Sequence, residues 1–392
     1  MDIQEEALIL HKKKKGKISL KSKVKCSNDH DLAVAYTPGV AEPCREIAKE
    51  KDKVYTYTAK GNWVAIVTDG TRVLGLGDIG PEAALPVMEG KAVLFKTFGN
   101  VDAFPICLAT KDVEEIVKAV KLIAPVFGAI NLEDVENPKC FQVEKRLKEE
   151  LDIPVFHDDQ HGTAVVALAG LVNSLKLVGK SKENIKVVIN GCGSAGIGIA
   201  RLWLSEGIRN IVLCDSKGVI SRDRTDLNEY KKAVAEASNP NNEKGSLSDV
   251  VKGADVLLGA SGPNLFTKEL ISSMASNAIV FALANPVPEI VPSEAKAAGA
   301  RVVATGRSDF PNQANNVLAF PGILRGTLDS RAREINQQMM IAAAYAIANL
   351  VSQEELKDDY ILPKPFDKRV RKEVTRAVIK AAKKTGVAGK RI

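Results

Sequence analysis

The stretch that most constrains the fold of this chain is a glycine-rich loop, Gly191-Cys192-Gly193-Ser194-Ala195-Gly196. An apolar run at residues 185–190 predicts a strand before the loop, and residues 197–205 predict a helix after it. The next predicted strand, residues 211–215, ends in Asp215. Glycines at these spacings let a pyrophosphate approach the backbone and the helix N-terminus, and an acid at the second strand end can bind a ribose. The sequence therefore predicts a dinucleotide-binding unit.

Further strands are predicted at residues 255–258, 279–283 and 302–304, with helical connections between them. This alternation of strands and helices predicts a doubly wound parallel sheet. Ser261, Gly262 and Asn285 follow two of these strands, at the edge where such sheets bind ligands. We expect them to contact the cofactor, although Asn285 before Pro286 is equally consistent with a plain turn.

The first half of the chain holds two pairs of adjacent acids, each at the end of a predicted strand. They are Glu133-Asp134 after the strand at 127–132 and Asp158-Asp159 after the strand at 153–156. Adjacent carboxylates are costly to bury without a cation, and oxygen ligands of this kind suit Mg²⁺ or Mn²⁺. Two such strand ends facing each other predict a divalent-metal site. The alternative is that Asp158 and Asp159 only cap a helix, which Gly162 and Thr163 open and residues 164–177 continue.

His157 and His161 lie four residues apart with acids between them, which resembles the helical motif of zinc proteases. The second position is Asp rather than Glu, however, and His157 falls at a predicted strand end rather than on a helix. Zinc-dependent hydrolysis is therefore not predicted.

Three further polar residues stand beside turns or apolar runs. Tyr36 precedes the turn formed by Pro38 and Gly39, and Arg72 precedes a second glycine-rich loop, where it could clamp a carboxylate. Lys91 lies in a predicted helix at 82–94 and is followed by apolar residues. Because burial lowers the pKa of a lysine, we expect Lys91 to be a candidate base.

Length and composition narrow the class of protein. A chain of 392 residues allows two domains, and we predict an α/β substrate and metal domain at 1–160 and the dinucleotide-binding domain with C-terminal helices at 161–392. A net charge of +7 with only 5% aromatic residues does not favour nucleic-acid binding. No uninterrupted apolar stretch approaches the roughly 20 residues of a membrane helix. Six cysteines without metal-type spacing indicate reduced thiols and a cytoplasmic location.

Together these stretches resemble the malic enzymes of the short prokaryotic type. The matching motifs are AYTPGVA at 35–41, GTRVLGLGD at 70–78, EGK at 89–91, LED at 132–134, DDQHGT at 158–163, the glycine loop, FALANP at 281–286 and NN at 315–316. Each motif alone is common, but their occurrence in family order is specific. His161 departs from the apolar residue of many relatives. The phosphotransacetylase-like extension of some relatives does not follow residue 392, so we expect no regulation through it.

The resemblance implies oxidative decarboxylation of (S)-malate to pyruvate and CO₂ with NAD or NADP, and it allows decarboxylation of oxaloacetate. The residues that it assigns are Tyr36 as general acid, Lys91 as general base, Asp158 as a helper, Arg72, Asn285 and Asn316 as substrate ligands, and Glu133, Asp134 and Asp159 as ligands of Mg²⁺ or Mn²⁺. It also implies a homodimer or larger homo-oligomer, in which Lys60 is a residue that could reach a neighbouring subunit's site.

The choice between NAD and NADP depends on the residues around Asp215. An acid at this position accepts hydrogen bonds from ribose hydroxyls and repels a 2′-phosphate, which favours NAD; the alternative is that Asp215 only forms a turn. Three nearby cations favour NADP instead, because they can bind its 2′-phosphate. They are Lys217, Arg222 and Arg224. We expect both cofactors to work, with NAD somewhat preferred.

Two other classes of protein contain the same glycine-rich loop. A hydroxy-acid or amino-acid dehydrogenase that does not decarboxylate would not need two acid pairs at strand ends. A non-enzymatic dinucleotide sensor would bind NAD without turnover or metal dependence. The number of matching motifs favours the malic enzyme interpretation over both.

Overall fold

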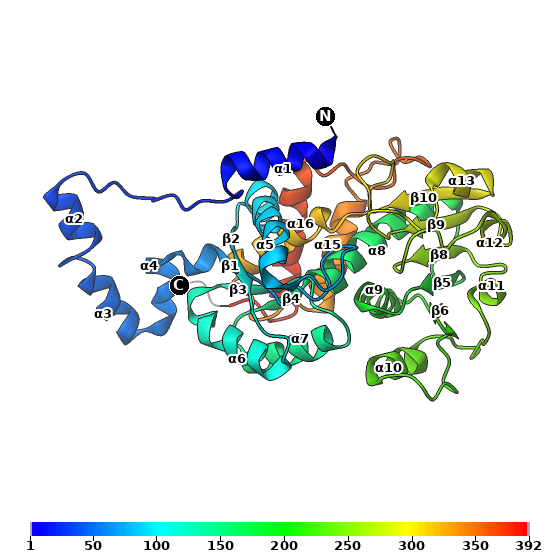
Figure 1. Cartoon of the computed structure of the whole chain (residues 1–392), viewed down its shortest axis with the longest axis horizontal. Helices are drawn as coiled ribbons and strands as arrows, with labels where there is room; N and C mark the ends of the chain where they lie inside the picture. The colour runs from blue at the N-terminus through cyan, green and yellow to red at the C-terminus, as the bar shows by residue number, and fades with distance from the viewer. Residues whose placement is uncertain (1, 390–392) are drawn as a thin grey trace.

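The computed structural model describes residues 2–389 and contains two β-sheets flanked by helices (Figure 1). The first sheet has four parallel strands in the order β2-β1-β3-β4. Its strands are β1 (Trp63–Thr68), β2 (Asp102–Cys107), β3 (Ala129–Leu132) and β4 (Val155–His157). β3 and the three-residue β4 are buried throughout, as expected for strands covered by helices on both faces.

The second sheet has six strands in the order β10-β9-β8-β5-β6-β7. They are β5 (Lys186–Asn190), β6 (Asn210–Asp215), β7 (Gly218–Val219), β8 (Val256–Gly259), β9 (Ala278–Ala282) and β10 (Ala300–Thr305). All pair in parallel except β7, which is antiparallel to β6. The strand order reverses direction at β5, which lies between β6 and β8, so the predicted doubly wound α/β sheet is confirmed.

Helices cover both sheets. Around the first sheet lie α4 (Val54–Tyr57), α5 (Gly80–Leu94), α6 (Val113–Ile123) and α7 (Lys139–Glu150). Around the second lie α9 (Ser194–Ser205), α10 (Glu229–Ala237), α11 (Leu247–Val250), α12 (Lys268–Ser272) and α13 (Pro292–Ala297). The chain closes with α14 (Phe320–Asp329), α15 (Gln337–Ala348) and α16 (Lys368–Lys384), which pack on one another.

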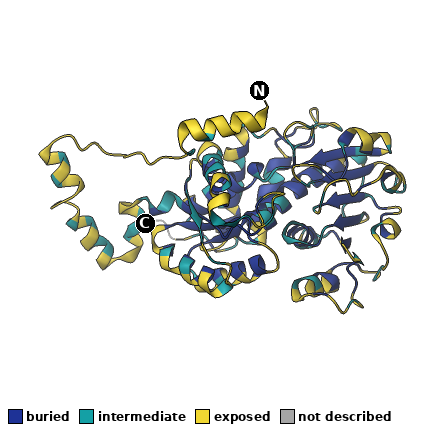
Figure 2. Cartoon of the chain, in the orientation of Figure 1, coloured by how far each residue is buried: buried dark blue, intermediate teal, exposed yellow. Residues whose placement is uncertain are grey.

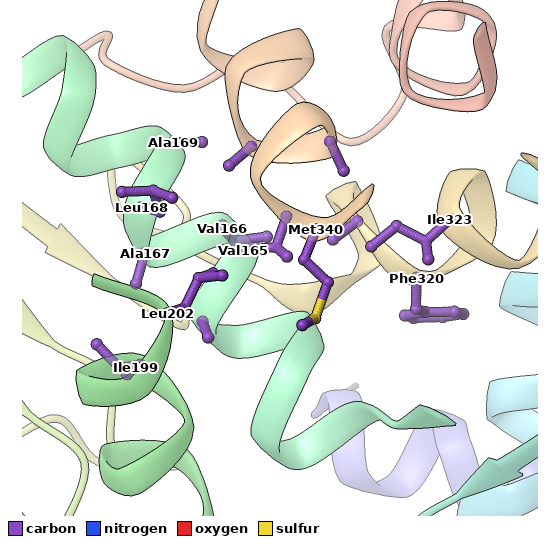
Figure 3. Close-up of a cluster of buried hydrophobic side chains, with 14 of the residues drawn as sticks. Val165, Val166, Ala167, Leu168, Ala169, Ile199, Leu202, Phe320, Ile323 and Met340 are labelled. Atoms are coloured by element: carbon purple, nitrogen blue, oxygen red, sulfur yellow. The ribbon is translucent and has the colours of Figure 1, made fainter. Parts of the chain in front are cut away.

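The long helix α8 (Asp158–Val178) joins the two sheets and lies in the common core. It packs against α9 and α15, and Val165, Leu168 and Met340 are among the buried side chains of this region (Figure 3). By length and composition alone α8 could cross a membrane, but 67% of its apolar window is buried inside the protein. This burial is that of a core helix in a soluble protein.

The start of α8 differs from the sequence prediction. Gly162 and Thr163 were expected to open the helix, whereas it begins at Asp158, directly after β4. Asp158 and Asp159 therefore form its first turn, where the helix dipole favours negative charge. The predicted domain boundary at residue 160 falls inside this turn and stays a prediction.

The N-terminal segment lies outside the body of the protein. Helix α1 (Ile3–Lys14) rests along one edge, and an extended stretch then leads to α2 (Asp29–Ala35) and α3 (Ala41–Lys49), which project away (Figure 1). We call residues 20–50 the N-terminal arm. Neither α2 nor α3 has a buried residue, and the arm is mostly exposed (Figure 2). An arm with apolar side chains and no core of its own needs another surface to pack on.

Candidate active site

The two predicted acid pairs meet at the carboxyl edge of the first sheet. β3 and β4 are neighbours and pair through Leu132 and His157, so the acids that follow them lie side by side. One carboxylate oxygen from each of Glu133, Asp134 and Asp159 lies within 4.8 Å of the other two. Asp159 also accepts a hydrogen bond of 2.9 Å from the backbone amide of Asp134. The structure thus brings the predicted metal ligands together.

Lys91 on α5 is buried, and its ammonium lies between two of these carboxylates. Its Nζ is 2.8 Å from Glu133 Oε1, 2.5 Å from Asp158 Oδ2 and 4.3 Å from the centroid of the Phe320 ring. Burial works to lower the pKa of Lys91, but the charges of Asp158 and Glu133 outweigh it, so this pKa is raised. The lowered pKa expected from the sequence is therefore wrong, because an apolar run does not reveal the two carboxylates that face Lys91.

The acid cluster fits a divalent cation. Asp134 Oδ2 and Asp158 Oδ1 are buried and accept no hydrogen bond from the residues that the structure describes. Burial and the charge of Asp159 raise the pKa of Asp134 to about 7. Burial also raises the pKa of Glu133 well above its ordinary value, although Lys91 opposes this shift. Carboxylates held this close with a single ammonium lack positive charge, which a cation bound through oxygen would supply.

A buried hydrogen-bond network behind the cluster was not predicted. His157 Nε2 lies 3.0 Å from Asp159 Oδ2, and His157 Nδ1 lies 2.6 Å from Gln160 Nε2. Gln160 donates to Glu144 at 2.8 Å, and His161 Nε2 lies 2.6 Å from the other oxygen of Glu144. The network fixes the orientation of Asp159, a role typical of residues behind a metal ligand. The signal in the sequence was Glu144, an acid on the apolar face of α7.

Two of the predicted substrate ligands lie near the cluster. Asn316, in a short helical turn before α14, donates to Asp158 Oδ2 at 2.6 Å. The backbone amide of Arg72 donates to the Asp134 carbonyl at 3.0 Å, which places Arg72 beside the metal ligands. The Arg72 side chain is exposed, and among the described residues it forms no ion pair. An unpaired guanidinium at this edge can receive a carboxylate.

Asn285 lies at the carboxyl edge of the second sheet, and its side chain is exposed. Its carbonyl oxygen and the ring of Pro286 lie within 3.2 Å of where a Cβ on Gly75 would stand. The glycine-rich loop after Arg72 therefore touches the turn after β9. This contact joins the carboxyl edges of the two sheets into one site.

The dinucleotide loop has the shape that a pyrophosphate requires. Gly191 has a φ of 120°, in the region that favours glycine, and a Cβ on Gly196 would lie 1.8 Å from the Gly191 carbonyl oxygen. Ser194 and Ala195 open α9, so backbone amides at a helix N-terminus face the loop. Gly193 faces the loop that follows Glu133 and Asp134, because a Cβ on Gly193 would lie 3.5 Å from Nδ2 of Asn137 in that loop.

Asp215 ends β6, as predicted, but its carboxylate is already paired. It lies 2.8 Å from Arg224 Nη1 and 2.6 Å from Lys231 Nζ, and it accepts a hydrogen bond from the Lys217 amide. Burial opposes the effect, yet the hydrogen bonds from Arg224 and Lys231 lower the pKa of Asp215. Arg222 instead donates to backbone carbonyls at 239 and 240. The negative charge that would repel a phosphate is therefore largely balanced.

Glu289 is a buried acid that the sequence did not mark as part of the site. It accepts hydrogen bonds from the backbone amides of Ser261, at 3.1 Å, and Ala284, at 2.9 Å. It thereby ties together the loops after β8 and β9, which carry the predicted cofactor ligands Ser261, Gly262 and Asn285. Ser261 also accepts a hydrogen bond of 3.1 Å from Asn190 at the end of β5.

Two residues do not join the cluster within one chain. Tyr36 ends α2 on the N-terminal arm, and 67% of its surface is exposed. Lys60 is buried, and its ammonium donates to the carbonyls of Ala124, Pro125 and Phe127 at 3.1, 2.9 and 2.6 Å. Lys60 thus braces its own subunit, and the expectation that it reaches a neighbouring subunit's site stays a prediction.

The fold is a doubly wound dinucleotide-binding fold, and its cofactor loop adjoins a carboxylate site with a buried lysine. This combination is typical of a metal-assisted dehydrogenase. Comparison with known proteins narrows this class. Residues 13–148 match the sequence model described as "Malic enzyme, N-terminal domain", and residues 160–383 match "Malic enzyme, NAD binding domain". The chain belongs to the malic enzyme family.

Individual relatives agree with this assignment. A protein of Bacillus subtilis named bifunctional malic/malolactic enzyme is 61% identical, over 99% of this chain and 95% of its own length. An NAD-dependent malic enzyme of Geobacillus stearothermophilus is 59% identical, over 96% of this chain and 78% of its own. The crystal structure of a malic enzyme from Pyrococcus horikoshii superposes with a TM-score of 0.95 at 48% identity, covering 100% of this chain and 93% of that one.

Proposed function

We propose that this protein catalyses the oxidative decarboxylation of (S)-malate to pyruvate and CO₂ with reduction of NAD or NADP. The observation that carries the proposal is the cluster of Glu133, Asp134 and Asp159 with Lys91 beside it, next to a dinucleotide loop. The reaction moves a hydride from C2 of malate to the nicotinamide and then breaks the bond between C3 and the departing carboxylate. The hydroxyl proton lost at C2 is balanced by a proton gained at C3, so no net proton is released.

The residues of the cluster have distinct tasks in this proposal. Arg72 and Asn316 bind and orient the malate carboxylates, and Glu133, Asp134 and Asp159 would hold Mg²⁺ or Mn²⁺. When bound, the cation would acidify the C2 hydroxyl and stabilise negative charge during loss of CO₂. Lys91 and Asp158, 2.5 Å apart, act as a pair that accepts the hydroxyl proton. Decarboxylation of added oxaloacetate would use the same site without the hydride step.

The proton for C3 requires Tyr36, which a single chain holds away from the cluster. The arm around it carries apolar side chains, with Leu32 48%, Val34 63% and Tyr36 67% exposed. We infer that the arm packs on a second copy of the chain, and that Tyr36 completes the partner's site. A homodimer is then the smallest active assembly. Nucleic-acid or membrane partners are not part of the proposal, and the location that we propose is the cytoplasm.

A second activity is favoured by the name of the Bacillus subtilis relative, bifunctional malic/malolactic enzyme. If pyruvate stays bound after loss of CO₂, the hydride can return from the reduced nicotinamide to C2 of pyruvate, and the C2 oxygen takes up one proton from solvent. The sum is conversion of malate to lactate and CO₂ with no net cofactor reduction. Measuring lactate and reduced cofactor together, with malate and NAD supplied, separates this outcome from release of pyruvate.

The metal is the sharpest test of the proposed reaction. EDTA should abolish formation of pyruvate and reduced cofactor, and Mg²⁺ or Mn²⁺ should restore both. Asp159→Asn should raise the metal concentration needed for half-maximal rate by about 10- to 100-fold, the usual effect of weakening a metal site. Asp152→Asn is the matched control, since Asp152 is an exposed acid at the other end of β4. Full activity in metal-free buffer would overturn the proposal.

A further inference from the structure

A buried carboxylate lies beneath the loops at the carboxyl edge of the second sheet. Glu289 follows β9, and none of its surface is exposed. It is so close to the end of β8 that a Cβ on Gly259 would lie 2.4 Å from the carboxyl carbon of Glu289. Burying a carboxylate costs free energy unless a cation or hydrogen bonds stabilise its charge. A glutamate at this position therefore needs partners that offset this cost.

Backbone amides, rather than a cation, stabilise Glu289. Its Oε1 accepts hydrogen bonds from the amide of Ser261 at 3.1 Å and from the Ser261 hydroxyl at 3.4 Å, and its Oε2 accepts one from the amide of Ala284 at 2.9 Å. Within residues 2–389, Glu289 forms no ion pair. Arg307, which donates a hydrogen bond to the loop after β9, is paired with Asp309 at 2.6 Å.

The hydrogen bonds around Glu289 favour its charged form. Burial raises the pKa of Glu289, and the amides of Ala284 and Ser261 oppose this rise. Both carboxylate oxygens accept hydrogen bonds from N–H donors, as an ionised carboxylate does. The result is a negative charge that is held by dipoles and is not neutralised by a neighbouring cation.

The two loops that Glu289 ties together belong to the nicotinamide half of the cofactor site. In a doubly wound sheet the two halves of a dinucleotide bind on either side of the point where the strand order reverses. That point is β5, and Asp215, the candidate ribose ligand, ends β6 on one side of it. The nicotinamide half then belongs to β8 and β9. The loop after β8 contacts the dinucleotide loop, because a Cβ on Gly191 would lie 2.3 Å from the Ala260 carbonyl oxygen.

We propose that Glu289 is a positioning residue for the nicotinamide half of the cofactor, and that its buried negative charge favours the oxidised ring over the reduced ring. This inference rests on the dinucleotide cofactor of the proposed function. Glu289 acts through the loops that carry Ser261 and Asn285 rather than by touching the cofactor. It is distinct from the residues that act on malate.

The charge of the nicotinamide ring gives the physical reason. The oxidised ring carries a formal positive charge. When the bond between hydrogen and C2 of malate breaks, the hydride brings two electrons to the ring, and the new bond between hydrogen and the ring leaves it neutral. A fixed negative charge therefore attracts only the oxidised ring. The low dielectric constant of a buried site limits the screening of this attraction.

A purely structural brace would have a different effect. If Glu289 only held the two loops together, its replacement would weaken the binding of NAD and NADH by the same factor. If its charge also acts on the ring, NAD alone loses the electrostatic attraction. The ratio of the two dissociation constants therefore separates the effect of charge from the effect of bracing.

Binding of NAD and of NADH to the intact protein tests the inference, with EDTA present and without malate. Glu289→Gln keeps the size of the side chain and removes its charge. It should raise the dissociation constant of NAD, relative to that of NADH, by about threefold or more, as expected for loss of one partly screened charge. Calorimetry measures both constants. Glu294→Gln is the matched control, because Glu294 is an exposed acid on α13 and the change in charge is the same.

Glu289→Asp separates position from charge, since it keeps the carboxylate and shortens the side chain by one methylene group. It should weaken NAD and NADH by the same factor and leave their ratio unchanged, and it keeps the inference testable if Glu289→Gln does not fold. An unchanged ratio in Glu289→Gln, or an equally changed ratio in Glu289→Asp, would overturn the inference. Because malate is absent, failure of the proposed reaction is observed separately, as a lack of pyruvate formation by the unaltered protein.

Discussion

Asp158 positions two other residues of the site, because one of its oxygens, Oδ2, accepts hydrogen bonds from both Lys91 and Asn316. Its other oxygen, Oδ1, lies 1.9 Å from where a Cβ on Gly162 would stand. The missing side chain at Gly162, one turn along α8, therefore provides the space in which Asp158 folds back toward Lys91. This explains a glycine inside a helix, where it is otherwise unfavourable.

Gly162→Ala should displace Asp158 from Lys91 and lower kcat/KM for malate by about 100-fold, because small shifts of positioned groups are costly in catalysis. The melting temperature should change much less than the rate. Gly90→Ala, next to Lys91 on α5, is the control, since the nearest atom to its Cβ is the end of the Lys17 side chain, Nζ, at 3.4 Å. A Gly162→Ala enzyme with normal kcat/KM would show that Asp158 need not hold this position.

We also expect single residues at the end of β6 to set the preference between NAD and NADP. Asp215→Ser should free Arg224 and Lys231 and shift the ratio of kcat/KM values toward NADP, because two cations then face the 2′-phosphate. Arg224→Ala should shift it toward NAD. We expect both cofactors to support the reaction in the unaltered protein. An unchanged ratio in both variants would mean that this strand end does not contact the ribose.

Among elements, the contact between α8 and α9 brings the cofactor loop to the acid cluster. A Cβ on Gly198 would lie 2.5 Å from the backbone oxygen of Gln160, an obstacle that cannot rotate away. Gly198→Ala should therefore separate the helices and lower the free energy of unfolding by about 1–3 kcal/mol. Gly61→Ala, whose nearest atom would be 3.7 Å away, is the control. Denaturant unfolding of both variants checks this, and equal stability would contradict the close packing.

The sequence predicted most of the elements and correctly placed the three candidate metal ligands together, because acids after neighbouring parallel strands share an edge of the sheet. α5 and α9 end at the predicted residues 94 and 205, and β6 ends at the predicted Asp215. The start of α8 was missed, since a glycine normally argues for a helix end. The pairing of Lys91 with Asp158 and of Asp215 with Arg224 was missed for a different reason. Local sequence does not show which distant charges face each other.

At the scale of the whole molecule, our proposal that one subunit supplies Tyr36 to the site of another can be tested by mixing two inactive variants. Tyr36→Phe and Lys91→Ala proteins should each be inactive or nearly so, with losses of about 100-fold for a missing acid or base. If the two inactive proteins are unfolded, mixed and refolded, activity should return to about one quarter of normal. Half of the random dimers are mixed, and each of these holds one intact site.

The same mixture distinguishes the alternative directly. If Tyr36 serves its own subunit, every site in the mixed dimer lacks either Tyr36 or Lys91, and no activity returns. Mixing two preparations of the Lys91→Ala protein by the same procedure is the control for recovery during refolding. Sedimentation of the mixture confirms that dimers have formed again.

The position of α8 has a consequence for how such proteins can diversify. One continuous core includes Val64 and Phe156 from the first sheet, Val187 and Leu213 from the second, and the buried face of α8 between them. The two halves are therefore not interchangeable modules. A recombinant that joins the first 160 residues of this chain to the remainder of a distant relative would bring together side chains that do not fit one another around α8. Substitutions in one half are therefore expected to be accompanied by substitutions in the other.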